Sequence, residues 1–107
     1  MDIDEVRRFL ATLPGTTEEP HFELTSARVG GKIYATWPGN GARIHVFLDA
    51  EQTEAAVAAI GAERLLWGSK LAGVRVDLPA DVRAILIEAW RRKAPKRVVA
   101  VWEAARL

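Results

Sequence analysis

The sequence contains no cysteine, which excludes disulfide bridges, thiolate metal sites and thiol nucleophiles. It contains only two histidines, and metal sites ordinarily need three or four protein ligands. No apolar run approaches the roughly 18 residues of a membrane span, and the N-terminus is acidic where a signal peptide is basic. We therefore expect a cytoplasmic protein with no membrane partner, stabilised by its core alone.

Catalytic motifs are also missing from the chain. There is no HExxH, GxGxxG or nucleophile elbow, and the close carboxylate pairs fall where helix capping or a solvated turn explains them. The segment Gly30-Gly31-Lys32 is similar to a phosphate loop, but it lacks the upstream glycine, the following Ser or Thr and a helix. The sequence thus predicts that the protein is not an enzyme and uses no cofactor or metal.

The composition that remains is that of a globular chain. Half of the 107 residues are apolar and 27% are charged, which predicts a single domain over residues 1–107. The net charge of +1 is unevenly distributed: residues 1–63 hold ten acidic and five basic side chains, and residues 64–107 hold four and ten. Such a charge dipole can orient a protein toward a polyanion, although solvated helix faces of different charge would give the same counts.

The clearest pattern in the chain is an antiparallel meander over residues 28–48. The glycine doublet Gly30-Gly31 and the segment at 38–41 are turn signals between runs of alternating side chains. The alternation predicts two faces: an apolar face of Ile33, Ala35, Trp37, Ile44, Val46 and Leu48, and a polar-aromatic face of Lys32, Tyr34, Thr36, Arg43, His45 and Phe47.

The rest of the chain supplies helices on either side of this meander. Capping residues, apolar spacing and breakers predict helices at 2–13, 50–60, 79–94 and 98–105, a first strand at 21–29 and a last one at 74–78. Pro79 is placed as a first-turn proline, the segment at 16–20 is expected to be a polar connection, and the segment at 62–73 stays undecided between strand and loop. This order predicts an α+β two-layer sandwich, with a meander sheet covered by the N- and C-terminal helices.

A basic run near the C-terminus is the strongest candidate binding feature. Five positive side chains fall within seven residues around the Pro95 break: Arg91, Arg92, Lys93, Lys96 and Arg97. They would suit phosphate contacts, but cations in the last turn of a helix also complement its macrodipole, which explains the first three equally well.

The histidines and tryptophans are weaker candidates. His21 and Glu23 would share one strand face, and a satisfied surface pair is more common there than an acid–base or metal site. His45 lies on the polar-aromatic face, where stacking or a phosphate contact competes with an ordinary exposed histidine. Core positions are the default for the four tryptophans; periodicity supports this for three of them, whereas Trp67 falls in the undecided segment and could be exposed.

Taken in order, several segments resemble the MmcQ/YjbR family of small bacterial proteins over almost the full length. These are LPGTTEE after the first helix, HFEL, the pair VGGKIYATW and ARIHVFL, the strand VRVDLP and the helix EAWRRKAPKR. The resemblance implies a frataxin-like fold and DNA binding through wing-like hairpins. It implies no catalytic residue.

Two hypotheses of function follow. In the first, the chain binds DNA: phosphate contacts come from Arg28, Lys32, Arg43, Arg91, Arg92, Lys93, Lys96 and Arg97, while Tyr34 and His45 offer stacking or hydrogen bonding. In the second, the chain binds a protein or a small ligand on an exposed sheet face formed by Tyr34, Thr36, His45 and Phe47.

Overall fold

The computed structural model describes residues 1–106, which form four helices and one six-stranded antiparallel sheet. The elements in chain order are α1 (Ile3–Leu10), β1 (Thr16–His21), β2 (Leu24–Val29), β3 (Lys32–Pro38), β4 (Arg43–Phe47), α2 (Ala50–Ile60), β5 (Glu63–Trp67), β6 (Lys70–Asp77), α3 (Arg83–Lys93) and α4 (Lys96–Ala104). The predicted α+β class is confirmed.

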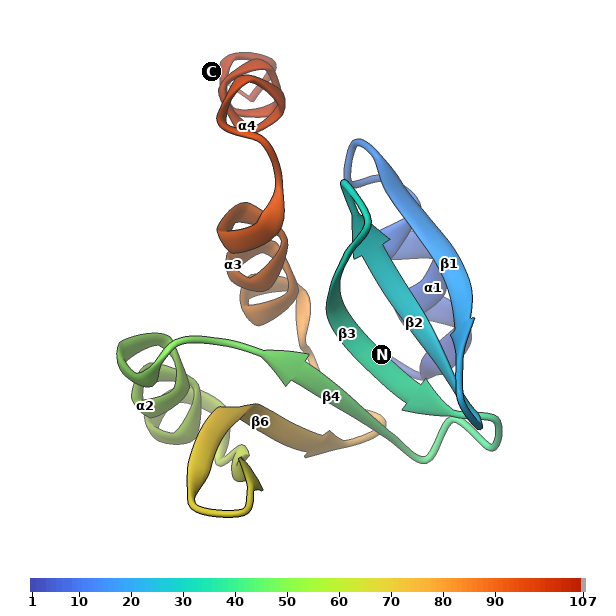
Figure 1. Ribbon diagram of the computed structural model, residues 1–107, viewed down its shortest axis with the longest axis vertical. Coiled ribbons are helices and arrows are strands. Elements are labelled where there is room, and N and C mark those ends of the chain that lie inside the picture. The colour runs from blue at the N-terminus through green and yellow to red at the C-terminus, as the bar shows by residue number, and fades with distance from the viewer. Residues whose placement is uncertain (107) are drawn as a thin grey trace.

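The strands lie in the order β1-β2-β3-β4-β6-β5, so that β1 and β5 are the two edges of the sheet. The helices α1, α2 and α3 cover one face, here called the inner face, on which Ala35, Val46 and Val74 are fully buried (Figure 1). The opposite, outer face carries His45 and Arg75. The helix α4 continues from the end of α3, and its Trp102 packs against Trp90 with 5.3 Å between the ring centroids.

Two helix starts predicted from capping residues are confirmed. Asp2 and Glu5 form a reciprocal capping box at α1, and Asp49 and Gln52 form the same arrangement at α2. Gly61 ends α2 in the left-handed conformation, with a φ of 65°.

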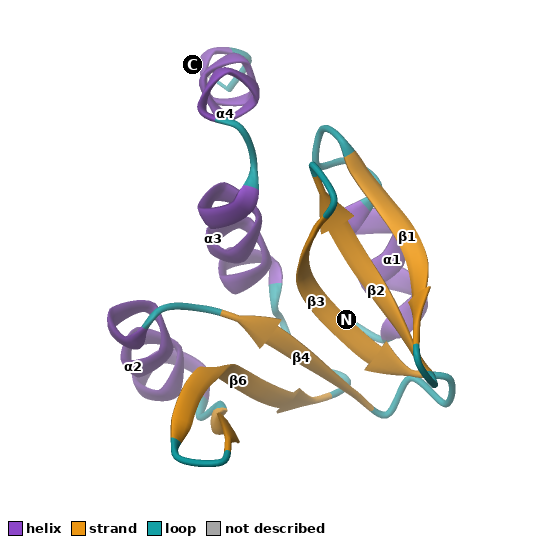
Figure 2. Cartoon of the chain, viewed as in Figure 1, coloured by secondary structure: helices purple, strands orange, loops and turns teal. Residues whose placement is uncertain are grey.

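The first part of the sheet differs from the prediction. Residues 16–20, expected to be a polar connection, belong to the edge strand β1, and the predicted strand at 21–29 is the turn and second strand of a hairpin (Figure 2). The polar sequence of β1 is explained by its position, because most of its side chains face solvent at the edge. Glu23 lies in the turn, so the predicted shared strand face of His21 and Glu23 is wrong.

The undecided segment at 62–73 is a hairpin made of β5 and the start of β6, with Gly68 at a φ of 64° in its turn. Gly73, on β6 opposite Phe47, lies so close to β4 that a Cβ there would overlap the backbone of Val46, Phe47 and Leu48. The expected first-turn role of Pro79 is wrong, since α3 begins only at Arg83.

A β-bulge in β3 changes which side chains face the core. Ala27 pairs with Ala35 and Arg28 pairs with Ile33, so Tyr34 is an extra residue without a partner on β2. Tyr34 and Ala35 are therefore both buried, and Ile33 turns to the outer face, opposite to the predicted alternation. The other five members of the predicted apolar face are buried as expected.

Candidate functional site

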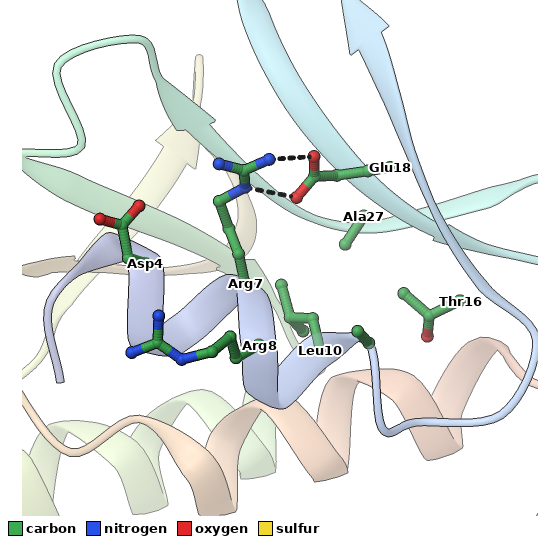
Figure 3. A pocket seen from close by; sticks show the side chains of 8 residues that line it. Asp4, Arg7, Arg8, Leu10, Thr16, Glu18 and Ala27 are labelled. Atoms are coloured by element: carbon green, nitrogen blue, oxygen red, sulfur yellow. Dashed lines mark hydrogen bonds and ion pairs between the residues drawn. The ribbon is translucent and has the colours of Figure 1, made fainter.

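Two cavities of similar volume lie on different parts of the molecule. The first, here called the groove, measures about 450 Å³ and lies between α1 and the β1–β2 hairpin. Its charged side chains are balanced: Asp4 and Glu18 accompany Arg7 and Arg8. Figure 3 shows the Arg7 guanidinium binding both oxygens of Glu18, with Nε–Oε1 and Nη2–Oε2 distances of 2.8 and 2.9 Å.

The second cavity, here called the pit, measures about 430 Å³. Strands β3 and β4 pair directly at only two positions, and the pit is lined by residues of both strands, of the end of α3 and of the β5–β6 hairpin. Its wall is apolar and its rim is basic: Ile33, Phe47, Leu48, Trp67, Leu71 and Ala72 form the wall, and His21, Lys70, Arg92 and Lys93 are the polar members. No carboxylate of the described residues lines it.

An aromatic pair forms part of this wall. The rings of Phe47 and Trp67 meet edge to face, with centroids 5.3 Å apart. Trp67 nevertheless keeps 62% of its surface exposed. The default expectation that this tryptophan belongs to the core is therefore wrong, and the 62–73 segment does contribute to a cavity.

The cations around the pit come from three separate segments. Lys70 follows the β5–β6 turn, Arg92 and Lys93 end α3, and Lys32 begins β3. Burial is the main cause that lowers the pKa of Lys93, and the nearby positive charges of Arg92 and Lys32 lower it further. The β2–β3 turn also approaches the α3–α4 junction, since a Cβ at Gly30 would lie 4.0 Å from Pro95 Cδ. The hairpin and the basic run are thus neighbours.

Ion pairing distinguishes these cations from five other basic residues, all of them arginines. Five arginines hold carboxylates: the pairs are Arg7–Glu18, Arg64–Glu54, Arg75–Glu63, Arg83–Asp81 and Arg91–Glu103. Within residues 1–106, no carboxylate forms an ion pair with Lys32, Lys70, Arg92 or Lys93. The charge at the pit is therefore uncompensated by the protein itself.

The predicted basic run does not act as one unit. Arg92 and Lys93 face the pit, whereas Arg91 is held by Glu103 of α4. Lys96 and Arg97 lie on α4, and Arg97 lines a small apolar cleft with Pro14 instead. The break at Pro95 thus divides the five charges between two surfaces.

The remaining predicted phosphate contacts lie elsewhere. Arg28 is partly buried on the outer face and donates hydrogen bonds to Ser26 Oγ at 3.0 Å and the Pro20 carbonyl at 3.3 Å. Arg43 is exposed at the start of β4, directly opposite Asp77 of β6. The structure therefore joins Lys32 to the pit cations but leaves Arg28 and Arg43 apart from them.

Tyr34 and Thr36 were predicted on an exposed face, and this prediction is wrong. Both are buried, with at most 2% of their surface exposed. The Tyr34 hydroxyl shares a 2.8 Å hydrogen bond with Thr16 Oγ1, and burial raises the pKa of Tyr34 to about 12. Stacking by Tyr34 is excluded, and the sheet-face docking surface loses two of its four members.

His45 is half-buried on the outer face and does not line the pit. Its Nε2 is enclosed and has no hydrogen-bond partner among the described residues. Burial, followed by the charges of Arg75 and Arg43, lowers the pKa of His45. These surroundings favour the neutral imidazole and make His45 a poor partner for a phosphate.

Sequence reasoning missed Lys70 and His21 as members of this site. Lys70 is not among the site residues predicted from the sequence, and His21 was assigned to a pair with Glu23. The available signal was the turn at Gly68-Ser69, which brings Trp67 and Lys70 opposite one another as hairpin partners. Within residues 1–106, no group of three histidine or acidic side chains is arranged to hold a metal ion.

Comparison of the chain with protein-family models, with curated proteins and with solved structures found no match. The resemblance to the MmcQ/YjbR family and the frataxin-like label therefore stay predictions. None of the helices in the described part of the chain has the length and hydrophobicity needed to cross a membrane.

Proposed function

We propose that this chain is a non-enzymatic DNA-binding protein whose phosphate contacts are centred on the pit. One observation carries the proposal: the unpaired cations Lys70, Arg92 and Lys93, from two segments distant in sequence, line one cavity that no described carboxylate lines, and the charge of Lys32 lies near enough to act on Lys93. Lys32, Lys70, Arg92 and Lys93 are the contacts proposed here.

The pairing pattern explains how a chain of net charge +1 can still attract a polyanion. A DNA phosphate competes poorly for an arginine that already binds a carboxylate, because that ion pair must first be broken. The pit cations have no such partner, so a phosphate can take up their charge directly. Each contact releases about one condensed counterion, which makes the affinity fall steeply with salt.

The test is fluorescence anisotropy of labelled DNA at about 50 and 200 mM salt. In the variant Lys70→Gln/Arg92→Gln/Lys93→Gln, the plot of log affinity against log salt should become less steep by about 2 to 3. Each lost phosphate contact reduces the magnitude of the slope by roughly 0.7 to 0.9. The matched control Arg64→Gln/Arg75→Gln/Arg83→Gln removes three paired charges, and the salt dependence of its DNA affinity should stay close to that of the wild type. Equal losses in both variants would show that net charge, and not the pit, drives binding.

A second candidate function is favoured by the size and the lining of the pit. A cavity of about 430 Å³ with an aromatic wall and a cationic rim is within the size of small-ligand sites. It suits a small anion that also carries a planar apolar group. Thermal-shift measurements with a set of mononucleotides and aromatic carboxylates test this function: stabilisation by one of them, and none by DNA, would favour it over the first.

A further inference from the structure

Trp67 is the feature of the pit that phosphate binding alone does not explain. Trp37 and Trp90 are buried and Trp102 is partly buried, whereas Trp67 exposes 62% of its surface. Phosphate contacts require only cations, so an exposed indole among them points to a ligand with an apolar face as well.

The ring is also held in place. Trp67 is the last residue of β5 and pairs with Lys70 across the hairpin, and its edge-to-face contact with Phe47 joins it to β4. The bulge at Tyr34 turns Ile33 outward, where it forms another part of the wall. The wall is thus built by β3, β4 and the β5–β6 hairpin and does not depend on a single loop side chain.

We propose that the pit receives an unpaired base, so that the protein binds single-stranded DNA in preference to a duplex. This inference rests on the proposed DNA binding and adds the strandedness of the target. Every base offers a flat face that can stack on an indole, but in a duplex both faces are already stacked on neighbouring base pairs. Only a single strand can therefore use Trp67 without first being unpaired.

The positions of the cations fit the same ligand. Lys70 lies beside Trp67 on the β5–β6 hairpin, and Arg92 and Lys93 line the pit from the end of α3. A strand whose base stacks on Trp67 can place phosphates on both sides of that base near these charges. Because the wall between them is apolar, it offers few groups to read base edges, and the binding is sequence-tolerant.

The experiment compares three labelled probes of equal length, roughly a dozen nucleotides: oligothymidylate, an abasic strand and a duplex. The abasic strand keeps the phosphates and lacks the bases. Wild-type protein should bind oligothymidylate about 5- to 150-fold more tightly than the abasic strand, which is the range expected for one stacked base. The duplex should bind no more tightly than the abasic strand.

Variants of the β5–β6 hairpin test whether this difference in affinity comes from the Trp67 indole. Trp67→Ala should bind oligothymidylate no more tightly than the abasic strand. Trp67→Phe should keep most of the difference in affinity between these two probes. Leu66→Ala is the matched control, because Leu66 is the neighbouring exposed apolar residue, 54% accessible, and does not line the pit. Tryptophan fluorescence should be quenched by oligothymidylate in the wild type and much less in Trp67→Phe.

The outcomes separate this inference from the proposed function. Equal affinity for all three probes, unchanged in Trp67→Ala, would overturn base stacking while leaving phosphate binding at the pit intact. If none of the three probes binds at about 50 mM salt, both proposals are overturned together.

Discussion

The groove and the pit are nearly equal in volume, yet they differ in how their charges are satisfied. In the groove, the Arg7 guanidinium binds both oxygens of Glu18, and the lining holds two acids and two bases. In the pit, the lining includes three basic side chains and no described carboxylate.

This difference teaches that the number of basic residues at a cavity is a poor guide to its ligand. Arg7 would look as suitable for phosphate binding as Arg92 or Lys93 if only the sequence were considered. What distinguishes Arg7 is that the fold provides a carboxylate within hydrogen-bond distance of it. The predictions below alter that distinction at one cavity or the other.

The largest effect is expected from reversing the charges of the pit. Arg92→Glu/Lys93→Glu should weaken DNA binding by roughly 100-fold at low salt, because two charge-assisted contacts are lost and become repulsive. Lys96→Glu/Arg97→Glu alters the same basic run by the same net charge, but on α4, and should change the affinity by less than about threefold. Anisotropy titrations measure both. Equal losses would contradict the division of the run at Pro95.

A smaller effect is expected from giving the pit a carboxylate of its own. Leu71→Glu places one acid in the wall beside the three basic side chains of the lining, so the pit then holds a carboxylate as the groove does. The affinity for DNA should fall by about tenfold, and Leu71→Met should leave it within about twofold. Circular dichroism verifies that both variants fold. An unchanged affinity in a folded Leu71→Glu would show that the wall lies outside the contact region.

Tyr34 tests whether the inner face takes part in binding at all. Tyr34→Phe removes the hydrogen bond to Thr16 and should lower the free energy of unfolding by about 1 kcal/mol while leaving DNA affinity unchanged. Urea unfolding and anisotropy measure the two quantities. A loss of DNA affinity with no loss of stability would show that Tyr34 contributes to the binding surface.

The same residue gives a pH dependence. Burial raises the pKa of Tyr34 from 10.0 to about 12, so the folded state disfavours the phenolate. The stability contributed by the neutral phenol is complete below pH 10 and is lost as the pH rises toward 12. Thermal unfolding should show a flatter alkaline decline for Tyr34→Phe. Since Tyr34 is the single tyrosine of the chain, ultraviolet titration reads its ionisation directly.

The smallest effect is expected from removing the acid of the groove. Glu18→Gln leaves Arg7 without its carboxylate, so the groove gains one unpaired cation. The melting temperature should change by only about a degree or two, because the pair is solvent-exposed, and DNA affinity should rise by less than about twofold. A larger gain in affinity would show that the groove can replace the pit as an anion site.

Much of the fold was predictable because local signals and tertiary structure agree. The capping boxes at Asp2 and Asp49, the helix end at Gly61 and the turn at Gly30-Gly31 each have a local cause. The edge strand β1 was missed because its polar sequence follows from being exposed at the edge of the sheet, and periodicity cannot show which strand lies at an edge.

The candidate site was predictable only in part. Lys32, Arg92 and Lys93 were identified as cations, but their convergence depends on the β2–β3 turn meeting the α3–α4 junction, which lies more than 60 residues further along the chain. Tyr34 was misplaced because one bulge residue shifts the alternation of β3, and the sequence alternates smoothly through it. The partner of Arg91 likewise lies on another helix.

The close approach of β4 and β6 at Gly73 has a consequence for the evolution of this protein. Any side chain at position 73 would force β4 outward, and Phe47, directly opposite, would move with it. The orientation of Trp67 depends on Phe47, so a substitution at a residue that does not line the pit would still reshape its aromatic wall. In related chains that keep this wall, we expect glycine to be the one residue tolerated at this position, and its replacement would mark a chain whose pit has changed its ligand.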